Sequence, residues 1–469
     1  MKTTFSLKID VFLWNKIFNV LYLSSHSYYS LQKLIFVNIN LYFNQVILDR
    51  TIAPEIKPLQ NFKLKQAQTF KLSNGIPIHV LHDANTDAVK IEFILDAGAW
   101  TDTVLGVSGI AMKMLAEGTS KYTATEIAEK IASYGAFFEQ HHGADRINLS
   151  VYTLSKFSAE LVEMVKSMLL DSQMPEKELQ KLIEIGKQTL GVNKEKTSFM
   201  ATATFKEALF GKNHPYGHTS FENHLDSITS SQVVDFYQQY IKSLSSLQIF
   251  VSGGLNAEKA IALFEKSFGN IEIGKIPVEN KFDISTKNQS IITNKEAALQ
   301  SSVRLGKIHI NRHHPDFLDF TVVNEVLGGY FGSRLMKNIR EDKGYTYGIG
   351  SQINVFKHAT YIAIGADVKK EAREATFAEI EKEIKILQTT LLDNEELNTV
   401  TNYMLGAFMG SISTPFALMD KYKMLQFNGL QYDYFDRYYQ TLTTIQPERI
   451  LALANQYLNY DDFVKVSVG

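Results

Sequence analysis

The chain of 469 residues contains the same order of predicted elements twice. The segment ITSSQVVDFYQQYIKSLSSLQIFVSGG, 228 to 254, has a counterpart in IQPERILALANQYLNYDDFVKVSVG, 445 to 469. Tyr240 and Tyr457 fall at matching places 217 residues apart, and PEKELQKL at 175–182 resembles DNEELNTV at 393–400. This period far exceeds the roughly 20 to 50 residues of a solenoid repeat. The sequence therefore predicts two homologous domains, at 49–271 and 289–469, with a linker at 272–288.

Each half mixes hairpin-like strands with paired amphipathic helices. TFKLSNGIPIHVL, 69 to 81, predicts two strands joined at Asn74-Gly75, a pair that suits a type I′ turn. Thr123 and Glu126 predict a capping box at the start of a helix that ends at Gly135. Groups of strands followed by groups of helices favour an α+β fold. We therefore expect each domain to be a largely antiparallel β-sheet with helices packed on one face.

Composition excludes several classes of protein. A formal net charge of -2 argues against a dedicated nucleic-acid surface. The chain has no cysteine, so any metal would need His, Asp or Glu ligands. No run of about 18 apolar residues occurs, so no membrane span is expected.

The first 48 residues differ from the rest, since they contain many aromatics and Asn but no Gly or Pro. Lys8, Asp10 and Lys16 interrupt any apolar core of a signal peptide. We interpret residues 1–48 as a dispensable extension, and the alternative is an export signal. The first interpretation is compatible with a cytoplasmic protein and the second with a periplasmic one.

Several short segments together carry a family resemblance. They are DAGAW at 96–100, GVSGIAMKMLAEGT at 106–119, and HPYG at 214–217. With the duplicated α+β halves, they resemble the pitrilysin/insulinase family of zinc metallopeptidases. The closest likeness is to its two-domain branch, which includes mitochondrial processing peptidases and bacterial homologues. The resemblance covers roughly residues 55 to 469.

Active members of that family carry an inverted H-x-x-E-H motif on a helix. Its two histidines bind zinc from one helix face, and its glutamate activates the zinc-bound water. Aligned by its flanks, the motif falls on Gly109, Met112 and Lys113, and a more distant glutamate ligand falls near Gln188 and Thr189. None of these side chains binds zinc well. The resemblance therefore implies that this chain holds no metal of its own.

The loop around HPYG offers the one other set of candidate metal ligands. It contains His214, His218, Glu222 and His224 within a short stretch. Relatives without a metal there share HPYG, so we expect a turn with solvated histidines rather than a metal site.

A glycine-rich segment in the second half, VLGGYFGSRLMKNIREDKGYTYGIGS at 326–351, is the best-preserved part of the resemblance. No GK[ST] follows its glycines, which argues against a phosphate loop. The resemblance implies a substrate-binding loop that contains Gly328, Gly329 and Gly332. It further implies that Arg340 holds the substrate backbone and that Tyr347, seven residues on, donates to the oxyanion.

A structural interpretation of the same segment remains open. In it, the glycines form only a turn, Arg340 pairs with Glu341 or Asp342, and Tyr347 packs in the sheet.

The missing zinc ligands and the preserved glycine-rich segment together imply that catalysis is divided between two subunits. The chain resembles the non-catalytic, peptide-binding subunit of a heterodimeric peptidase, in which a homologous subunit carries the zinc. Arg340 and Tyr347 would contribute to the partner's zinc site, and an extended peptide would be the substrate. The alternatives are a structural homologue like the core proteins of respiratory complexes, a homodimeric peptide-binding protein, and a free-standing enzyme with another site.

Overall fold

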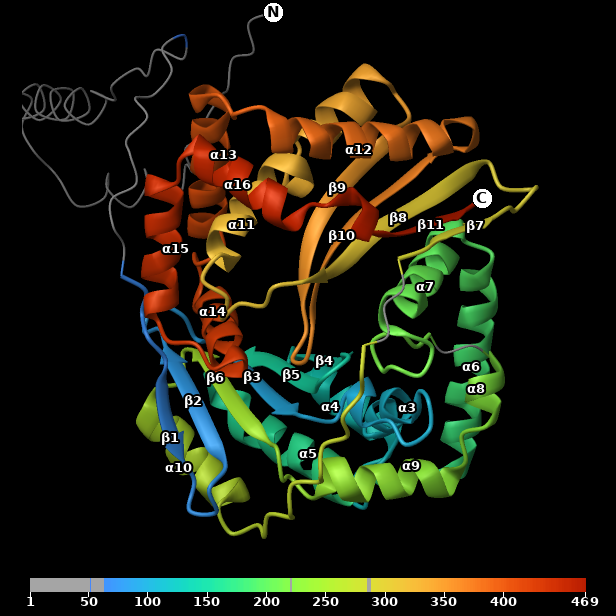
Figure 1. Ribbon diagram of the computed structural model, residues 1–469. Coiled ribbons are helices and arrows are strands. Elements are labelled where there is room, and N and C mark those ends of the chain that lie inside the picture. Colours follow the sequence, from blue (N-terminus) through green and yellow to red (C-terminus); the bar gives the residue numbers. More distant parts are fainter. Residues whose placement is uncertain (1–50, 52–62, 220–221, 285–287) are drawn as a thin grey trace, which may run out of the picture. The chain divides into compact units, whose positions relative to one another are not determined.

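Two β-sheets with corresponding strand orders form the framework of the protein (Figure 1). The computed structural model describes Thr51 and residues 63–219, 222–284 and 288–469. The described residues from 63 onward belong to one compact unit. The extension predicted at 1–48 lies outside the described residues.

The first sheet has the order β1-β2-β6-β3-β5-β4 and the second the order β7-β11-β8-β10-β9. Apart from β1, the two orders correspond strand for strand. Each sheet contains one parallel pair, β2 with β6 and β7 with β11, and its other pairs are antiparallel. The α+β class with two homologous, largely antiparallel domains is confirmed. The domain limits at 271 and 289 stay a prediction.

The strands of the first half are β1 (Gln68–Lys71), β2 (Pro77–His82), β3 (Ala88–Leu95), β4 (Phe137–His142), β5 (Ile147–Leu154) and β6 (Gln248–Gly253). Its helices are η1 (Ala99–Thr101), α3 (Val107–Met114), α4 (Ala124–Ser133), η2 (Ser155–Phe157), α5 (Ser158–Asp171), α6 (Glu176–Lys194), α7 (Thr197–Phe210), α8 (Glu222–Asp226), α9 (Ser230–Phe236), η3 (Tyr237–Lys242) and α10 (Ala257–Phe268).

The strands of the second half are β7 (Ser290–Thr293), β8 (Gln300–His309), β9 (Thr346–Val355), β10 (Thr360–Lys369) and β11 (Val464–Val468). Its helices are α11 (Phe317–Asn324), η4 (Glu325–Gly329), η5 (Met336–Asp342), η6 (Lys370–Ala372), α12 (Arg373–Thr389), α13 (Asn394–Gly410), α14 (Pro415–Asn428), α15 (Asp433–Thr444), α16 (Pro447–Tyr457) and η7 (Tyr460–Asp462).

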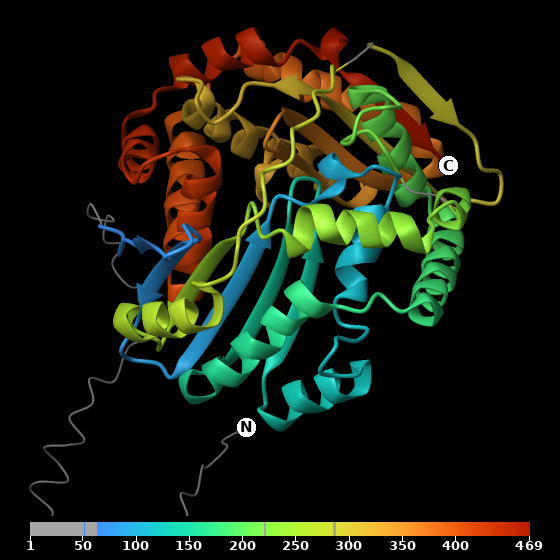
Figure 2. The ribbon, with the colours of Figure 1, turned by 90° about the horizontal axis from the view of Figure 1, so that it is seen from below.

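One face of each sheet is covered by helices from the same half of the chain. Figure 2 looks onto the helical side of the first sheet, where α5, α9 and α10 lie. Alternate residues of β3, such as Ile91 and Phe93, enter that core. In the second sheet, Val303 of β8 and Ile364 of β10 pack with helices α11, α12, α13, α15 and α16 in the same manner.

The opposite face of each sheet is partly covered by a helix from the other half. Helix α14 packs Met419 and Tyr422 on Leu81 and Phe250 of the first sheet. Helix α7 packs on β8 and β11 of the second sheet. A Cβ atom on Gly306 would lie only 2.6 Å from Cζ of Phe205, so glycine is needed for this close approach of helix and strand. The two helices are 14 residues each and start 218 residues apart, and they are therefore the same element of the repeat, exchanged between the halves.

Of the local features predicted from the sequence, the helix cap and the helix end are confirmed and the turn type is not. The capping box of Thr123 and Glu126 is present, and Gly135 has a φ of +57°, as expected. The prediction of a type I′ turn at Asn74-Gly75 is wrong, because such a turn needs a positive φ at both residues. Only Gly75 has one, at +93°. The N–H of Gly75 donates to Leu72 O, so the hairpin has a longer loop that ends in a glycine bulge.

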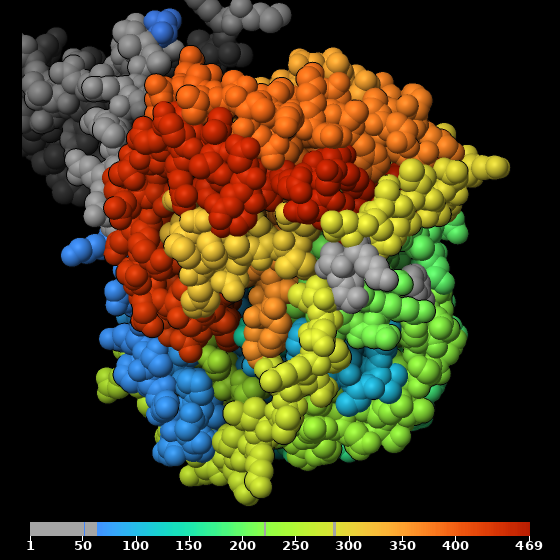
Figure 3. All heavy atoms as spheres, viewed as in Figure 1, coloured from blue at the N-terminus to red at the C-terminus, as the bar shows by residue number. Residues whose placement is uncertain are grey.

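Residues 272–284 contain neither helix nor strand. This segment is mostly exposed and runs over the surface in the yellow part of Figure 3. None of the helices in the described part of the chain combines the length and the apolar character that a membrane span requires.

Candidate functional site

Helix α3 holds the positions of the zinc motif, and most of its side chains belong to the core. Met112 is 2% exposed and packs among the apolar residues of the first half. Its carbonyl accepts a hydrogen bond from Gln140 Nε2 at 2.6 Å. Asp102 holds the start of the helix, because its carboxylate accepts from the N–H groups of Gly106 and Ser108, each at 2.8 Å. Burial raises the pKa of Asp102.

His142 lies beside the first histidine position of the motif. A Cβ atom on Gly109 would lie 3.6 Å from two atoms of the His142 ring, so a histidine at 109 would compete for this space. His142 Nε2 is 2.7 Å from the hydroxyl of Ser108, which is fully buried. Burial lowers the pKa of His142 to about 4, and the nearby His141 and Lys113 add to the effect. His142 is therefore a neutral packing residue at pH 7.

The remaining motif positions offer no ligands. Lys113 is exposed on α3, and Gln188 and Thr189 are exposed on α6. The hydroxyl of Thr189 donates to Ile185 O within its own helix. In the part of the chain that the structure describes, no group of three or more His, Asp or Glu could hold a metal ion. The residues at the motif therefore do not fit zinc.

The HPYG loop also differs from its expectation. His214 is 3% exposed rather than solvated, because it stacks on Phe210 and its Nδ1 accepts from the Tyr216 N–H at 3.1 Å. Burial lowers its pKa. Glu222 forms an ion pair with Lys194 instead of facing the histidines. The loop is a packed aromatic junction.

The predicted glycine-rich loop in the second half is a tight, well-packed turn. Gly328 and Gly329 end the π-helix η4, and Gly332 lies in the turn before η5. None of the three has a positive φ. A Cβ atom on Gly328 would lie 2.8 Å from the backbone nitrogen of Ser351, so glycine lets the turn approach β9 closely.

Arg340 projects from η5 beside this turn. Its guanidinium lies 4.4 Å from the centre of the Phe331 ring, a cation–π contact. The Nη1 of Arg340 is buried without a hydrogen-bond partner among the described residues, so it is not paired with Glu341 or Asp342. An unsatisfied guanidinium nitrogen costs free energy unless a ligand supplies the acceptor.

Tyr347 stands on β9, the last strand of the second sheet. Its side chain is 91% exposed, so it does not pack in the sheet. Phe331, on the turn, is 63% exposed. Arg340 and Tyr347 thus come from neighbouring elements, η5 and β9, that pack on each other.

Two contacts at these candidate positions were not predicted from the sequence, that of His142 with α3 and that of Arg340 with Phe331. The alternation of burial along β4 places His142 toward α3, a signal that strand periodicity could have given. The stacking of Arg340 on Phe331 has no local signal, because the turn that joins them is not regular.

Two models of one peptidase family match the chain. The model described as "Insulinase (Peptidase family M16)" matches residues 78–217, and that described as "Peptidase M16 inactive domain" matches residues 227–404. The chain belongs to the M16, or insulinase, family. Because its zinc motif has lost every ligand, it is an inactive peptidase homologue within that family.

Several bacterial proteins are similar to this chain over most of its length. "Uncharacterized zinc protease YmxG" of Bacillus subtilis is 22% identical over 397 residues, 84% of this chain and 96% of the relative. "Non-peptidase homolog YmxG" of Helicobacter pylori is 24% identical, over 65% of this chain and 70% of the relative. The solved peptidase M16 inactive domain from Pseudomonas fluorescens superposes with a TM-score of 0.79 at 21% identity, over 86% of this chain and 98% of that one.

Proposed function

We propose that the chain is the non-catalytic, peptide-binding subunit of a heterodimeric M16 peptidase. A homologous subunit with an intact H-x-x-E-H motif would carry the zinc. This chain would supply the turn with Gly328, Gly329 and Gly332, together with Arg340 and Tyr347. The observation that carries the proposal is that Tyr347 is 91% exposed on β9, while on the adjoining helix η5 the Nη1 of Arg340 has no hydrogen-bond partner among the described residues.

The side chains suit two tasks in peptide hydrolysis. The free Nη1 of Arg340 donates to a carbonyl oxygen of the bound peptide, while Phe331 fixes the guanidinium from one face. The hydroxyl of Tyr347 donates to the oxyanion that develops as the scissile carbonyl is attacked. Since the motif positions of α3 offer no ligand, the partner subunit would hold the metal, which would there activate the attacking water.

The chain's own contribution to the oxyanion would be one hydroxyl donor. Tyr347 lies at an irregularity of β9, between Thr346 and Ile349, which pair with Val368 and Ala366 of β10. The paired residues on either side fix where the donor leaves the strand, and a donor aimed at developing charge stabilises it electrostatically.

Reconstitution tests the proposal. The purified chain alone is expected to contain no stoichiometric zinc after dialysis and to cleave no peptide. A mixture with an M16 subunit that carries the zinc motif, encoded in the same genome, should form a heterodimer on size-exclusion chromatography. Peptide cleavage by the mixture should exceed that of the zinc-bearing subunit alone. If the subunits associate and this chain adds nothing to cleavage, it is a structural homologue.

A further inference from the structure

A groove opens on the face of the second sheet that α7 partly covers. It has a volume of about 410 Å³ and lies between α7 and the outer strands β9 and β10. We call it the α7–β9 groove. Its size is in the range of sites that bind small ligands or short peptide segments. Arg340 and Tyr347 do not line it.

Glycines form the floor of this groove. Helix α7 reaches β8 and β11, but toward the same side the outer strands carry Gly365 of β10 and Gly348 and Gly350 of β9. A Cβ atom on Gly348 would meet nothing within 4 Å. An extended chain can therefore lie close to the sheet there. Gln352 and Asn354 line the groove farther along β9 and present amide groups to it.

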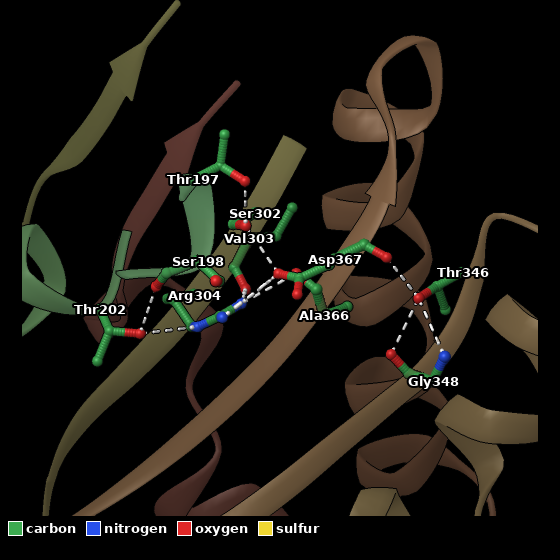
Figure 4. Close-up of polar contacts among 10 residues, drawn as sticks. All are labelled: Thr197, Ser198, Thr202, Ser302, Val303, Arg304, Thr346, Gly348, Ala366 and Asp367. Carbon is green, nitrogen blue, oxygen red and sulfur yellow. Dashed lines mark hydrogen bonds and ion pairs between the residues drawn. The ribbon is translucent and has the colours of Figure 1, made fainter. Parts of the chain in front are cut away.

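Arg304 forms the inner wall and is already satisfied within the protein (Figure 4). Its Nη1 donates to Val303 O at 2.9 Å and to Ala366 O at 3.0 Å, and it pairs with Asp367 at 3.3 Å. Its Nε donates to Thr202 of α7 at 3.3 Å. The charge of Arg304 is thus balanced by Asp367, the one acidic residue that lines the groove.

Lys206 supplies a second positive charge that is not balanced. It lies on α7 at the edge of the groove, and no carboxylate among the described residues acts on it. Burial alone lowers its pKa, and no carboxylate offsets that effect. A partly buried ammonium without a counter-ion would gain free energy from a carboxylate that entered the groove.

We propose that the α7–β9 groove binds an extended peptide segment and holds an acidic side chain of that segment against Lys206. The glycine floor leaves room for the peptide backbone, and the side-chain amides of Gln352 and Asn354 form hydrogen bonds with the backbone amides of the peptide. Lys206 forms an ion pair with the acidic side chain. The inference rests on the proposed peptide-binding function and gives the substrate a preference for Asp or Glu at one position. The groove differs from the Arg340 and Tyr347 site, which acts on the peptide bond.

A binding experiment with the full chain tests the groove without any partner. Two fluorescent peptides are compared by anisotropy: a short Ala/Ser peptide with one central Glu, and the same peptide with Gln. We expect the Glu peptide to bind about tenfold more tightly, as for a hydrogen bond to a charged group. Lys206→Met should abolish this preference, and Lys206→Arg should keep it.

Two further variants separate charge from shape. Lys177→Met changes the net charge equally on the exposed face of α6, and the preference should persist. Gly348→Val places a side chain in open space on a strand, so folding should survive, and binding of both peptides should weaken. Equal affinities for the two peptides, or a preference that survives Lys206→Met, would overturn the groove while leaving the proposed function intact. Failure of both peptides to bind the isolated chain would also overturn the groove proposal, whereas the proposed function fails only if the reconstituted pair gains no cleavage from this chain.

Discussion

Helix α3 and the β9 region hold the two sets of residues that the family resemblance singles out, and they differ in burial. At α3, Met112 is 2% exposed, and His142 lies against Gly109. At β9, Tyr347 is 91% exposed, and Arg340 has a guanidinium nitrogen without a partner. The first place has become part of the hydrophobic core, whereas the second still presents polar groups outward.

The contrast indicates which place is still available for function. A core position is explained by packing alone, and the methionine at 112 contributes apolar burial that a glutamate could not. An exposed tyrosine adds nothing to the core, and an unpaired guanidinium nitrogen lowers stability. Such side chains are consistent with a ligand or partner that is bound during function.

The largest effect is expected at Met112. Met112→Glu would place a carboxylate in the core without a partner and should lower the free energy of unfolding by about 3 to 5 kcal/mol. Lys113→Glu, on the exposed side of the same helix, should change it by less than about 0.5 kcal/mol. Urea unfolding of the two variants measures both. Equal effects would show that α3 is not packed as described.

The pH dependence of stability should distinguish the two places next. His142 has a pKa of about 4 in the folded chain against an ordinary value of 6.5, so unfolding takes up a proton between these values. Its contribution is complete above pH 6.5 and is lost as the pH falls toward 4, by about 3 kcal/mol in all. His142→Gln should flatten this part of the profile. Unfolding midpoints measured from pH 7 to pH 4 check it, and superimposable profiles would contradict it.

Arg340→Ala tests whether the second place binds peptide. Removing the guanidinium should raise KM of the reconstituted pair about tenfold, the cost of one hydrogen bond to a charged group. Lys337→Ala, on an exposed position of the same helix, serves as the control and should leave KM unchanged. Arg340→Lys should restore only part of the affinity, because an ammonium lacks the planar fork that stacks on Phe331. An unchanged KM in Arg340→Ala would remove Arg340 from the substrate site.

The smallest effect is expected for the stability of Tyr347→Phe. The hydroxyl lies on a side chain that is 91% exposed, so the free energy of unfolding should change by less than about 0.5 kcal/mol. Thermal unfolding of the isolated chain measures it. A larger loss would mean that Tyr347 has a structural role.

Sequence reasoning succeeded where the information was local or repeated. The capping box at Thr123 and Glu126 needs only four residues. The offset between the halves predicted two homologous domains, and the strand orders of their sheets correspond apart from β1. It failed at Asn74, because the type of turn depends on how the two strands meet.

The exchange of α7 and α14 between the halves was also beyond the sequence. The apolar residues of neither helix are clearly segregated to one face, so periodicity does not tell which sheet each helix will cover. The positions of Arg340 and Tyr347 came from a resemblance, and their exposure could not be known before the turn at Gly328 was placed against β9.

The turnover of the reconstituted pair with Tyr347→Phe tests the division of labour most directly. The substitution removes one oxygen and leaves the ring, so folding and association should be unchanged. Loss of one oxyanion donor typically lowers kcat about 100- to 1000-fold, and we expect a loss in this range with KM nearly constant. If the variant pair cleaves at the unmutated rate, Tyr347 plays no part in the chemistry, and the chain is a structural homologue of the peptidase.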